Sequence, residues 1–412
     1  MKTDVFTYTN PSLSSPVKNG LLAGKTFSIQ PNMSVRGWPT DAGSLALKGF
    51  VAIEDATVIQ RMKNAGAVIV GSARMSELGL GLNGDTSGLA LAEGRSEMAF
   101  MTDMMGEARI TASRIKAYGF KPTSGIVSRF GLIGLVPSME CFGILASNPN
   151  DITTVMGIIA GNDDRDFSLF DGEMPRFDKA SGTAPSMNAI GIVNECMEHL
   201  SGEESRAFRN GMEKLKALGF GIQEVSLPDF DIFRTIHHIV GSVEASSSCG
   251  KYDGVRYGHR TATAKNWNDM YLKSRSECFG LLVKTYLFQG AYFQFENYAA
   301  FENASRIRAR LVKDIDGIFT RVDALAFPTR RRDLHAGAAK TVDDIYDECA
   351  LTLPANVTGL PSVQIPGYVL DGNTDMGLQI VGARMSDARL LSLSVDYHIE
   401  SQRSLMQWNT KR

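Results

Sequence analysis

The sequence lacks a marked excess of charge of either sign. Its 43 basic and 45 acidic residues give a formal net charge of −2. A protein that binds nucleic acid through its overall field carries a strongly basic surface, so the charge balance argues against a nucleic acid partner. The densest basic run, Arg330 to Arg332, is too short to form a specific motif, and we interpret it as a solvated loop.

Long hydrophobic runs are also absent. No stretch approaches the ~20 apolar residues that cross a bilayer. The first residues, Met1 to Asp4, lack the apolar core of a signal peptide. We therefore expect no membrane partner and a cytoplasmic location.

Cysteine and histidine are scarce, and neither is arranged as a ligand set. The five cysteines are an odd number and form no C-x-x-C pair, which argues against a disulfide framework and favours reduced thiols. Among the six histidines, His237 and His238 are adjacent and would point to different faces of a helix or strand. We expect no metal site and no cofactor.

The sequence does contain the alternation of short apolar runs and amphipathic segments that is typical of α/β proteins. In the segment 55–65, Val58, Met62 and Ala65 recur at helical spacing, and 67–71 reads as a buried strand. Further predicted strands lie at 25–29, 322–329, 362–366 and 376–382, and further predicted helices at 203–217 and 296–319. Without a flexible linker, residues 1–412 are predicted to form one domain, in which 151–320 is the more helical region.

Three consecutive motifs carry a family resemblance. Thr102–Ile110, Tyr118–Gly125 and Val127–Leu132 follow the order D-T-G-G-S-I-R, then G-L-K-P-T-x-G-x-V-S-R-x-G, and so the chain resembles the amidase signature family. The likeness extends over approximately 20–400, and the segment 244–258 resembles the amidotransferase A subunits of that family. The resemblance implies an α/β fold with a large mixed sheet sandwiched between helices.

The same resemblance implies a Ser–cisSer–Lys relay, and this chain departs from it at each member. The nucleophilic serine is replaced by Glu107 and the basic lysine by Gln30, whose amide has no useful basicity. The loop with the bridging serine and the small-residue helix after it are expected to be missing, so that Gly88 leads almost directly to Glu97. At the family's glutamine-binding aspartate stands Cys349.

Other parts of the family site are retained. Asp103, Gly106 and Arg109 match the family's turn, whose backbone N–H groups near Met105 and Gly106 are expected to form an anion-binding nest. The resemblance also retains Tyr252 and Arg256. The candidate pocket therefore comprises Gln30, Asp103, Met105, Gly106, Glu107, Arg109, Tyr252, Arg256 and Cys349.

Three interpretations follow for function. The first is a degenerate amidase that acts by binding a small ligand or a protein partner, either an amidotransferase-type subunit or a second copy of the chain. The second is an enzyme with altered chemistry on an amide or related substrate, in which Glu107 serves as acid or base. In the third, an ordinary amidase site is assembled around Ser96 or Ser113.

The surroundings of Glu107 discriminate between these interpretations. We expect its carboxylate to be paired, most simply with Arg95 or Arg109. We also expect at least two of four nearby methionines to be buried close to it, because methionine fills irregular gaps. These methionines are Met98, Met101, Met104 and Met105.

Overall fold

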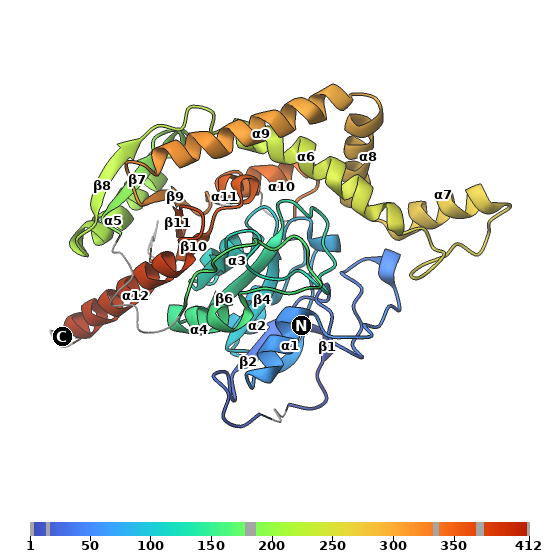
Figure 1. Cartoon of the computed structure of the whole chain (residues 1–412), viewed down its shortest axis with the longest axis horizontal. Coiled ribbons are helices and arrows are strands. Elements are labelled where there is room, and N and C mark those ends of the chain that lie inside the picture. Colours follow the sequence, from blue (N-terminus) through green and yellow to red (C-terminus); the bar gives the residue numbers. More distant parts are fainter. Residues whose placement is uncertain (1–3, 14–16, 178–186, 333–337, 368–374, 410–412) are drawn as a thin grey trace.

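The structure is a computed structural model of the whole chain (Figure 1). The residues that it describes are 4–13, 17–177, 187–332, 338–367 and 375–409. No helix in this part of the chain combines the length and the apolar character that crossing a bilayer requires. All five cysteines are buried free thiols, as expected.

A single mixed sheet organises the described residues, as the sequence predicts for the fold class. Its eleven strands lie in the order β1-β3-β2-β4-β6-β5-β10-β11-β9-β7-β8. The β3-β2-β4 and β9-β7-β8 pairings are parallel and the others are antiparallel. The strands are β1 (Phe6–Thr9), β2 (Thr26–Ile29), β3 (Val68–Ala73), β4 (Met98–Asp103), β5 (Tyr118–Lys121), β6 (Cys141–Ala146), β7 (Ala189–Val193), β8 (Gly221–Val225), β9 (Ala324–Pro328), β10 (Ser362–Ile365) and β11 (Leu378–Gly382).

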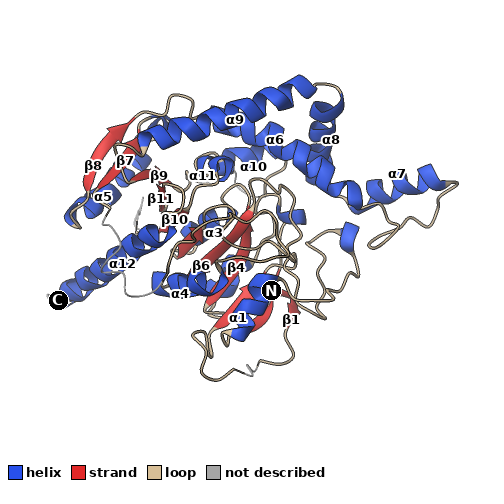
Figure 2. Cartoon of the chain, viewed as in Figure 1, coloured by secondary structure: helices blue, strands red, loops and turns tan. Residues whose placement is uncertain are grey.

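Helices cover both faces of this sheet. In Figure 2 the strands run through the middle of the molecule, with α6 and α9 on one side and α4 and α12 on the other. The helices are α1 (Thr57–Asn64), α2 (Ser87–Ala92), α3 (Glu107–Arg114), α4 (Pro149–Ile159), α5 (Gly202–Ala217), α6 (Ile232–Ser248), α7 (Trp267–Cys278), α8 (Leu281–Phe295), α9 (Tyr298–Ile318), α10 (Val342–Cys349), α11 (Leu353–Thr358) and α12 (Asp387–Asn409).

Strand alternation divides the core into two faces. In β9, Ala324 and Ala326 belong to the core shared with α1, α4, α5 and α12, whereas Leu325 and Phe327 belong to the core under α6, α8 and α9. Successive side chains of a strand point to opposite faces, so a strand that is buried on both sides is apolar throughout. This explains why the central strands read as continuous apolar runs in the sequence.

The predicted elements are confirmed within a few residues, with one exception. A small-residue helix was expected to be missing after Gly88, but α2 occupies Ser87–Ala92. Six residues are too few to establish a helical period, and the helix therefore left no recognisable pattern. The segment between the predicted strand at 67–71 and the motif at 102–110 consequently contains a helix that the sequence did not predict. The assignment of 1–412 to one domain stays a prediction.

Candidate functional site

The turn between β4 and α3 brings together most of the residues that the family motif predicts. Its last residue, Gly106, has φ +115°, and a β-carbon there would lie 2.1 Å from Oγ1 of Thr352. Only glycine adopts this conformation freely and permits this approach. The hydroxyl of Thr352 donates to the carbonyl of Met105, which ties the turn to the residues just before α11. Gly106 therefore fixes where α3 begins.

Glu107 is the first residue of α3, and its carboxyl group folds back over the turn. One oxygen, Oε2, accepts hydrogen bonds from the backbone N–H groups of Met104 at 2.8 Å and Met105 at 2.7 Å. Glu107 thus occupies the N–H groups of Met104 and Met105, whereas the anion-binding nest was predicted near Met105 and Gly106. Pairing with arginine was expected and is wrong: Arg95 pairs with Glu93, and Arg109 with Asp103.

Burial sets the charge of this group. Glu107 is 2 % exposed, and its other oxygen, Oε1, is buried without a hydrogen-bond partner in the described structure. Burial, reinforced by the nearby Asp103 carboxylate, raises the pKa of Glu107 to about 8, although the two backbone N–H groups oppose the shift. At neutral pH the carboxyl group is therefore mostly protonated.

Arg109 and Asp103 form a buried ion pair beneath Glu107. Both side chains are 0 % exposed, and the guanidinium binds both carboxylate oxygens of Asp103 at 3.1 and 2.8 Å. Its other N–H groups donate to the carbonyl of Thr352 and to the side chains of Gln379 and Asn356. These five bonds use all five N–H groups of the arginine. The Arg109 charge holds the pKa of Asp103 below its usual range despite burial.

Gln30, at the position of the family lysine, is held by neighbours on two sides. Its amide oxygen accepts from the backbone N–H of Thr102 at 2.8 Å, and its amide nitrogen donates to Asp85 at 2.6 Å. Asp85 also accepts from the backbone N–H of Ser87 at the start of α2. Gln30 thus links β2, β4 and the loop before α2, and it acts as a structural connector with no free basic atom.

A buried chain of side chains that the sequence did not reveal ends at the same turn. Nε2 of His237 lies 3.0 Å from the carbonyl of Met104, and Nδ1 lies 2.9 Å from the hydroxyl of Tyr346. Since a carbonyl can only accept, Nε2 carries the proton and Tyr346 donates to Nδ1. Tyr346 in turn accepts from Tyr286 at 3.0 Å. Burial lowers the pKa of His237 to about 3, so the ring is neutral.

The remaining predicted residues divide between this cluster and other places. The expectation for the methionines is confirmed, because Met104 and Met105 are buried and their backbone N–H groups bind Glu107. Cys349 is also buried, and burial, with a contribution from the Glu107 charge, raises the pKa of its thiol. Tyr252 packs instead against Phe279 and Tyr257, and Arg256 is an exposed side chain near Asp253.

The two serines considered as alternative nucleophiles each donate a hydrogen bond to an uncharged oxygen atom. Ser96 donates to the hydroxyl of Ser28 at 3.0 Å, and Ser113 donates to the carbonyl of Asp375 at 3.2 Å. Ser96 precedes β4 whereas Glu107 follows it, which places them roughly 20 Å apart along a six-residue strand. Neither hydroxyl donates to a base, and a serine needs one to act as a nucleophile.

The arginine run after β9 is not the solvated loop that the sequence suggested. Arg330 is buried and donates to the carbonyl of Asp375 at 3.0 Å, while Arg331 donates to the carbonyl of Asp347. Only Arg332 is exposed, and it pairs loosely with Glu203. The run therefore holds the end of β9 in place, because buried guanidinium groups require acceptors that a short run of letters does not reveal.

No group of three or more potential metal ligands occurs among the described residues. The cluster around Glu107 consequently offers a protonated carboxyl group, a satisfied ion pair, an amide connector and a neutral histidine. Within the described part of the chain it contains no serine hydroxyl beside a base, which is what acyl transfer through a serine requires.

Comparison with known proteins agrees with the fold and the motifs. The family model described as Amidase matches residues 12–90 and 86–391. The chain is 32% identical over 397 residues to the A subunit of the glutamyl-tRNA(Gln) amidotransferase of Lactobacillus acidophilus, covering 90% of this chain and 82% of that protein.

Two solved structures share the fold. The A subunit of the glutamyl-tRNA(Gln) amidotransferase of Thermotoga maritima superposes with a TM-score of 0.78 at 24% identity, covering 95% of this chain and 86% of that one. A protein from an unexpected vestigial complex that reveals the origins of an s-triazine catabolic enzyme gives a TM-score of 0.76 at 21% identity, covering 93% and 85%.

Proposed function

The chain belongs to the amidase family, and from that premise we propose that it has lost serine-relay amide hydrolysis and works by binding a partner protein. The observation that carries the proposed loss of hydrolysis is the carboxyl group of Glu107, which accepts the N–H groups of Met104 and Met105 in the turn after β4. Oriented backbone donors stabilise the oxyanion of acyl transfer only when they are free to bind it. Here they are occupied by the residue that stands where the nucleophile would be.

Ammonia release tests the proposed loss of amide hydrolysis. The purified protein should release no ammonia from glutamine or from simple amides above background. The double variant Gln30→Lys with Glu107→Ser should also stay inactive, because a relay needs a bridging serine, and the hydroxyl of Ser87, the serine that follows the serine-free loop 80–86, forms no hydrogen bond to Gln30 or Glu107 in the described structure. Robust hydrolysis by the wild type, or by this double variant, would overturn the proposal.

The proposed binding of a partner protein rests on an exposed apolar face of α8. Leu281, Phe288 and Phe295 are each 74% exposed, and Tyr292 is 52% exposed. Their spacing of seven, four and three residues places them on one side of the helix. The opposite side packs tightly on α6, where a β-carbon at Gly290 would lie 1.9 Å from the carbonyl oxygen of Ser242. A helix that is apolar all round is normally covered on all sides.

We assign this face to a partner protein of different sequence. The relative from Lactobacillus acidophilus is itself named as a subunit, and interface centres are rich in aromatic residues. Exposed apolar patches of this kind mark interaction sites. In Figure 1, α8 lies beside α6 and next to the start of α9, with α7 extending outward from the same end of the molecule. The exposed fractions of its apolar side chains show that the described residues leave this face open.

A matched pair of variants tests the assignment. Phe288→Lys should abolish co-purification of the partner from the native host, whereas Ile53→Lys, which changes an even more exposed apolar residue elsewhere, should not. The protein identified by mass spectrometry is then mixed with the purified chain, and its mass in complex is measured by light scattering. A homodimer, or a complex that survives Phe288→Lys, would contradict the assignment.

One observation favours the second interpretation, an enzyme with altered chemistry. The pKa of Glu107 is raised to about 8 by burial, and Oε1 has no partner within the described structure, which is the state of a general acid at neutral pH. If Glu107 is such an acid, Glu107→Gln should abolish an activity found by screening amides, esters and related substrates. If the screen finds no activity that this substitution removes, only the binding proposal remains.

A further inference from the structure

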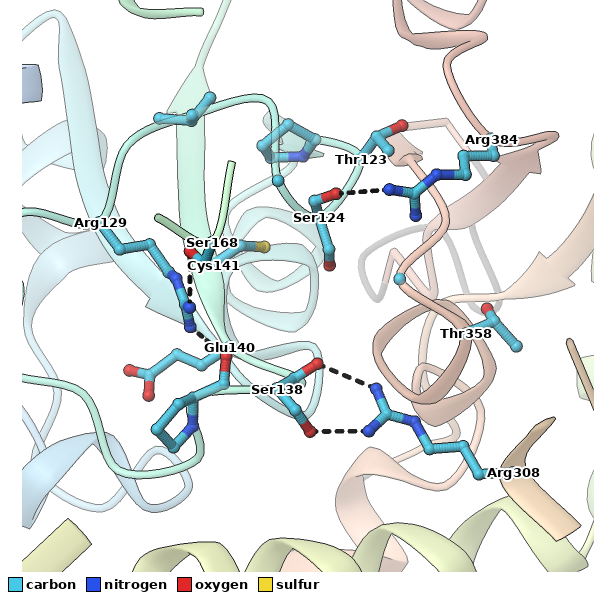
Figure 3. A pocket seen from close by; sticks show the side chains of 15 residues that line it. Thr123, Ser124, Arg129, Ser138, Glu140, Cys141, Ser168, Arg308, Thr358 and Arg384 are labelled. Carbon is cyan, nitrogen blue, oxygen red and sulfur yellow. Dashed lines mark hydrogen bonds between the residues drawn. The ribbon is translucent and has the colours of Figure 1, made fainter. Parts of the chain in front are cut away.

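A cavity separate from the cluster around Glu107 is lined by three arginines. It has a volume of about 260 Å³ and lies between the loop after β5, helix α9 and the loop after β11. Arg129, Arg308 and Arg384 come from these three segments, and Figure 3 shows their guanidinium groups reaching toward it from different walls. Segments far apart in the sequence thus place three positive charges around one small space.

The hydrogen bonds of these arginines go to uncharged groups. Arg308 donates to the carbonyl of Val357 at 2.8 Å and to the carbonyl and hydroxyl of Ser138 at 2.9 and 2.7 Å. Arg384 donates to the carbonyl of Ser124 at 3.3 Å. These bonds orient the two guanidinium groups without neutralising them.

Arg129 follows the same pattern. It donates to the carbonyl of Pro137 and, at 2.9 Å, to the hydroxyl of Ser168. Among the residues that the structure describes, no carboxylate forms an ion pair with any of the three guanidinium groups. Two carboxylates outside the lining partly offset two of these charges, Asp166 that of Arg129 and Glu244 that of Arg308. Like charges that face one space repel one another, and a bound anion would lower that repulsion further.

One acidic residue lies in the lining itself, and it offsets the charge of the arginines only in part. Glu140 is buried, and its Oε2 accepts from the backbone N–H groups of Leu135 and Val136 at 2.7 and 3.2 Å. Burial raises the pKa of this carboxyl group to about 7, so it is only partly ionised at neutral pH. The net charge of the lining therefore stays positive.

Donors also remain for a ligand. A guanidinium group has five N–H donors, and within the described structure Arg384 uses one of them and Arg129 two. The hydroxyl groups of Ser124 and Thr358 also line the cavity. The space is thus bounded by unused charged donors and by hydroxyl groups, which together are the chemistry of an oxyanion site.

We propose that this cavity binds the phosphoryl group of a small molecule. Three guanidinium groups on three walls match the three terminal oxygens of a phosphoryl group, whereas a carboxylate has two oxygens in one plane. The volume lies just below the ~300 to 1,000 Å³ that is usual for drug-sized ligands, so the occupant is small. The site does not depend on the state of Glu107, and it goes beyond the proposed function.

Calorimetry with inorganic phosphate and with pyrophosphate tests the proposal. The wild type should bind both, and the affinity should fall as the salt concentration rises. Arg384→Gln should weaken binding about tenfold or more, because it removes a charged donor that makes only one bond in the described fold. Arg209→Gln, which changes an exposed arginine paired with Glu224, is the matched control and should bind like the wild type.

Two further arms distinguish a phosphoryl site from a general anion site and from the cluster around Glu107. Acetate and citrate should bind at least tenfold more weakly than phosphate, and equal binding would overturn the phosphoryl assignment. Glu107→Gln should leave phosphate binding unchanged, so that failure here is distinguishable from failure of the amide-site proposal. Absence of phosphate binding by the folded wild type, or equal loss in Arg384→Gln and Arg209→Gln, would overturn the site itself.

Discussion

Replacing Glu107 by glutamine tests the electrostatic description of the site most directly. The amide oxygen can accept the same two hydrogen bonds from Met104 and Met105, while the group no longer ionises. In the wild type the folded-state pKa is raised from 4.5 to about 8. The variant therefore differs from the wild type mainly in the cost of holding a buried negative charge.

The size and direction of the effect follow from linkage. Because the folded pKa lies above the unfolded one, the stabilisation is fully present below about pH 4.5 and is lost as the pH rises to about 8. A shift of one pKa unit corresponds to ~1.4 kcal/mol. Relative to the variant, the free energy of unfolding of the wild type should thus fall by about 4 kcal/mol between pH 5 and pH 9.

The measurement is urea denaturation of both proteins across this pH range, followed by circular dichroism. Taking the difference between the two curves removes the contributions of other titrating groups. Glu203→Gln, an exposed control, should give a curve parallel to that of the wild type. If the curves for the wild type and Glu107→Gln run parallel from pH 5 to pH 9, Glu107 is not a buried carboxyl group with a raised pKa, and the reasoning is refuted.

Two further substitutions test the framework around this group. Arg109→Met should cost about 3 to 5 kcal/mol of stability by urea denaturation, because it leaves the buried Asp103 carboxylate without its partner; a loss below about 1 kcal/mol would contradict the buried pair. Gly106→Ala should cost more than about 2 kcal/mol, since its β-carbon would meet Thr352 and its φ is positive; a variant as stable as the wild type would show that the turn is built differently.

The sequence predicted the fold well because its signals are distributed over many positions. Buried strands such as β3 and β9 and amphipathic helices such as α1 each contain a regular pattern. The helix α2 escaped because six residues of small side chains establish no period. The order of the three consecutive motifs identified the family, which no single motif would have done.

The site was predicted in composition and only partly in arrangement. The motif correctly brought Asp103, Gly106, Glu107 and Arg109 to one turn. It could not show that Arg109 is fully occupied by Asp103 and by uncharged acceptors, so that Glu107 must bind backbone instead. The contribution of His237 was missed for a similar reason: its partner Tyr346 lies 109 positions away, and no local pattern connects them.

The side chain of Glu107 is a ligand attached to its own binding site. Tethering gives it an effective local concentration far above that of a small anion in solution. A free anion must therefore compete with a carboxyl group that never diffuses away. The turn itself is held separately, by Gly106 and Thr352. Access to the N–H groups of Met104 and Met105 is consequently controlled by one side chain, and shortening that side chain would free them without rebuilding the fold.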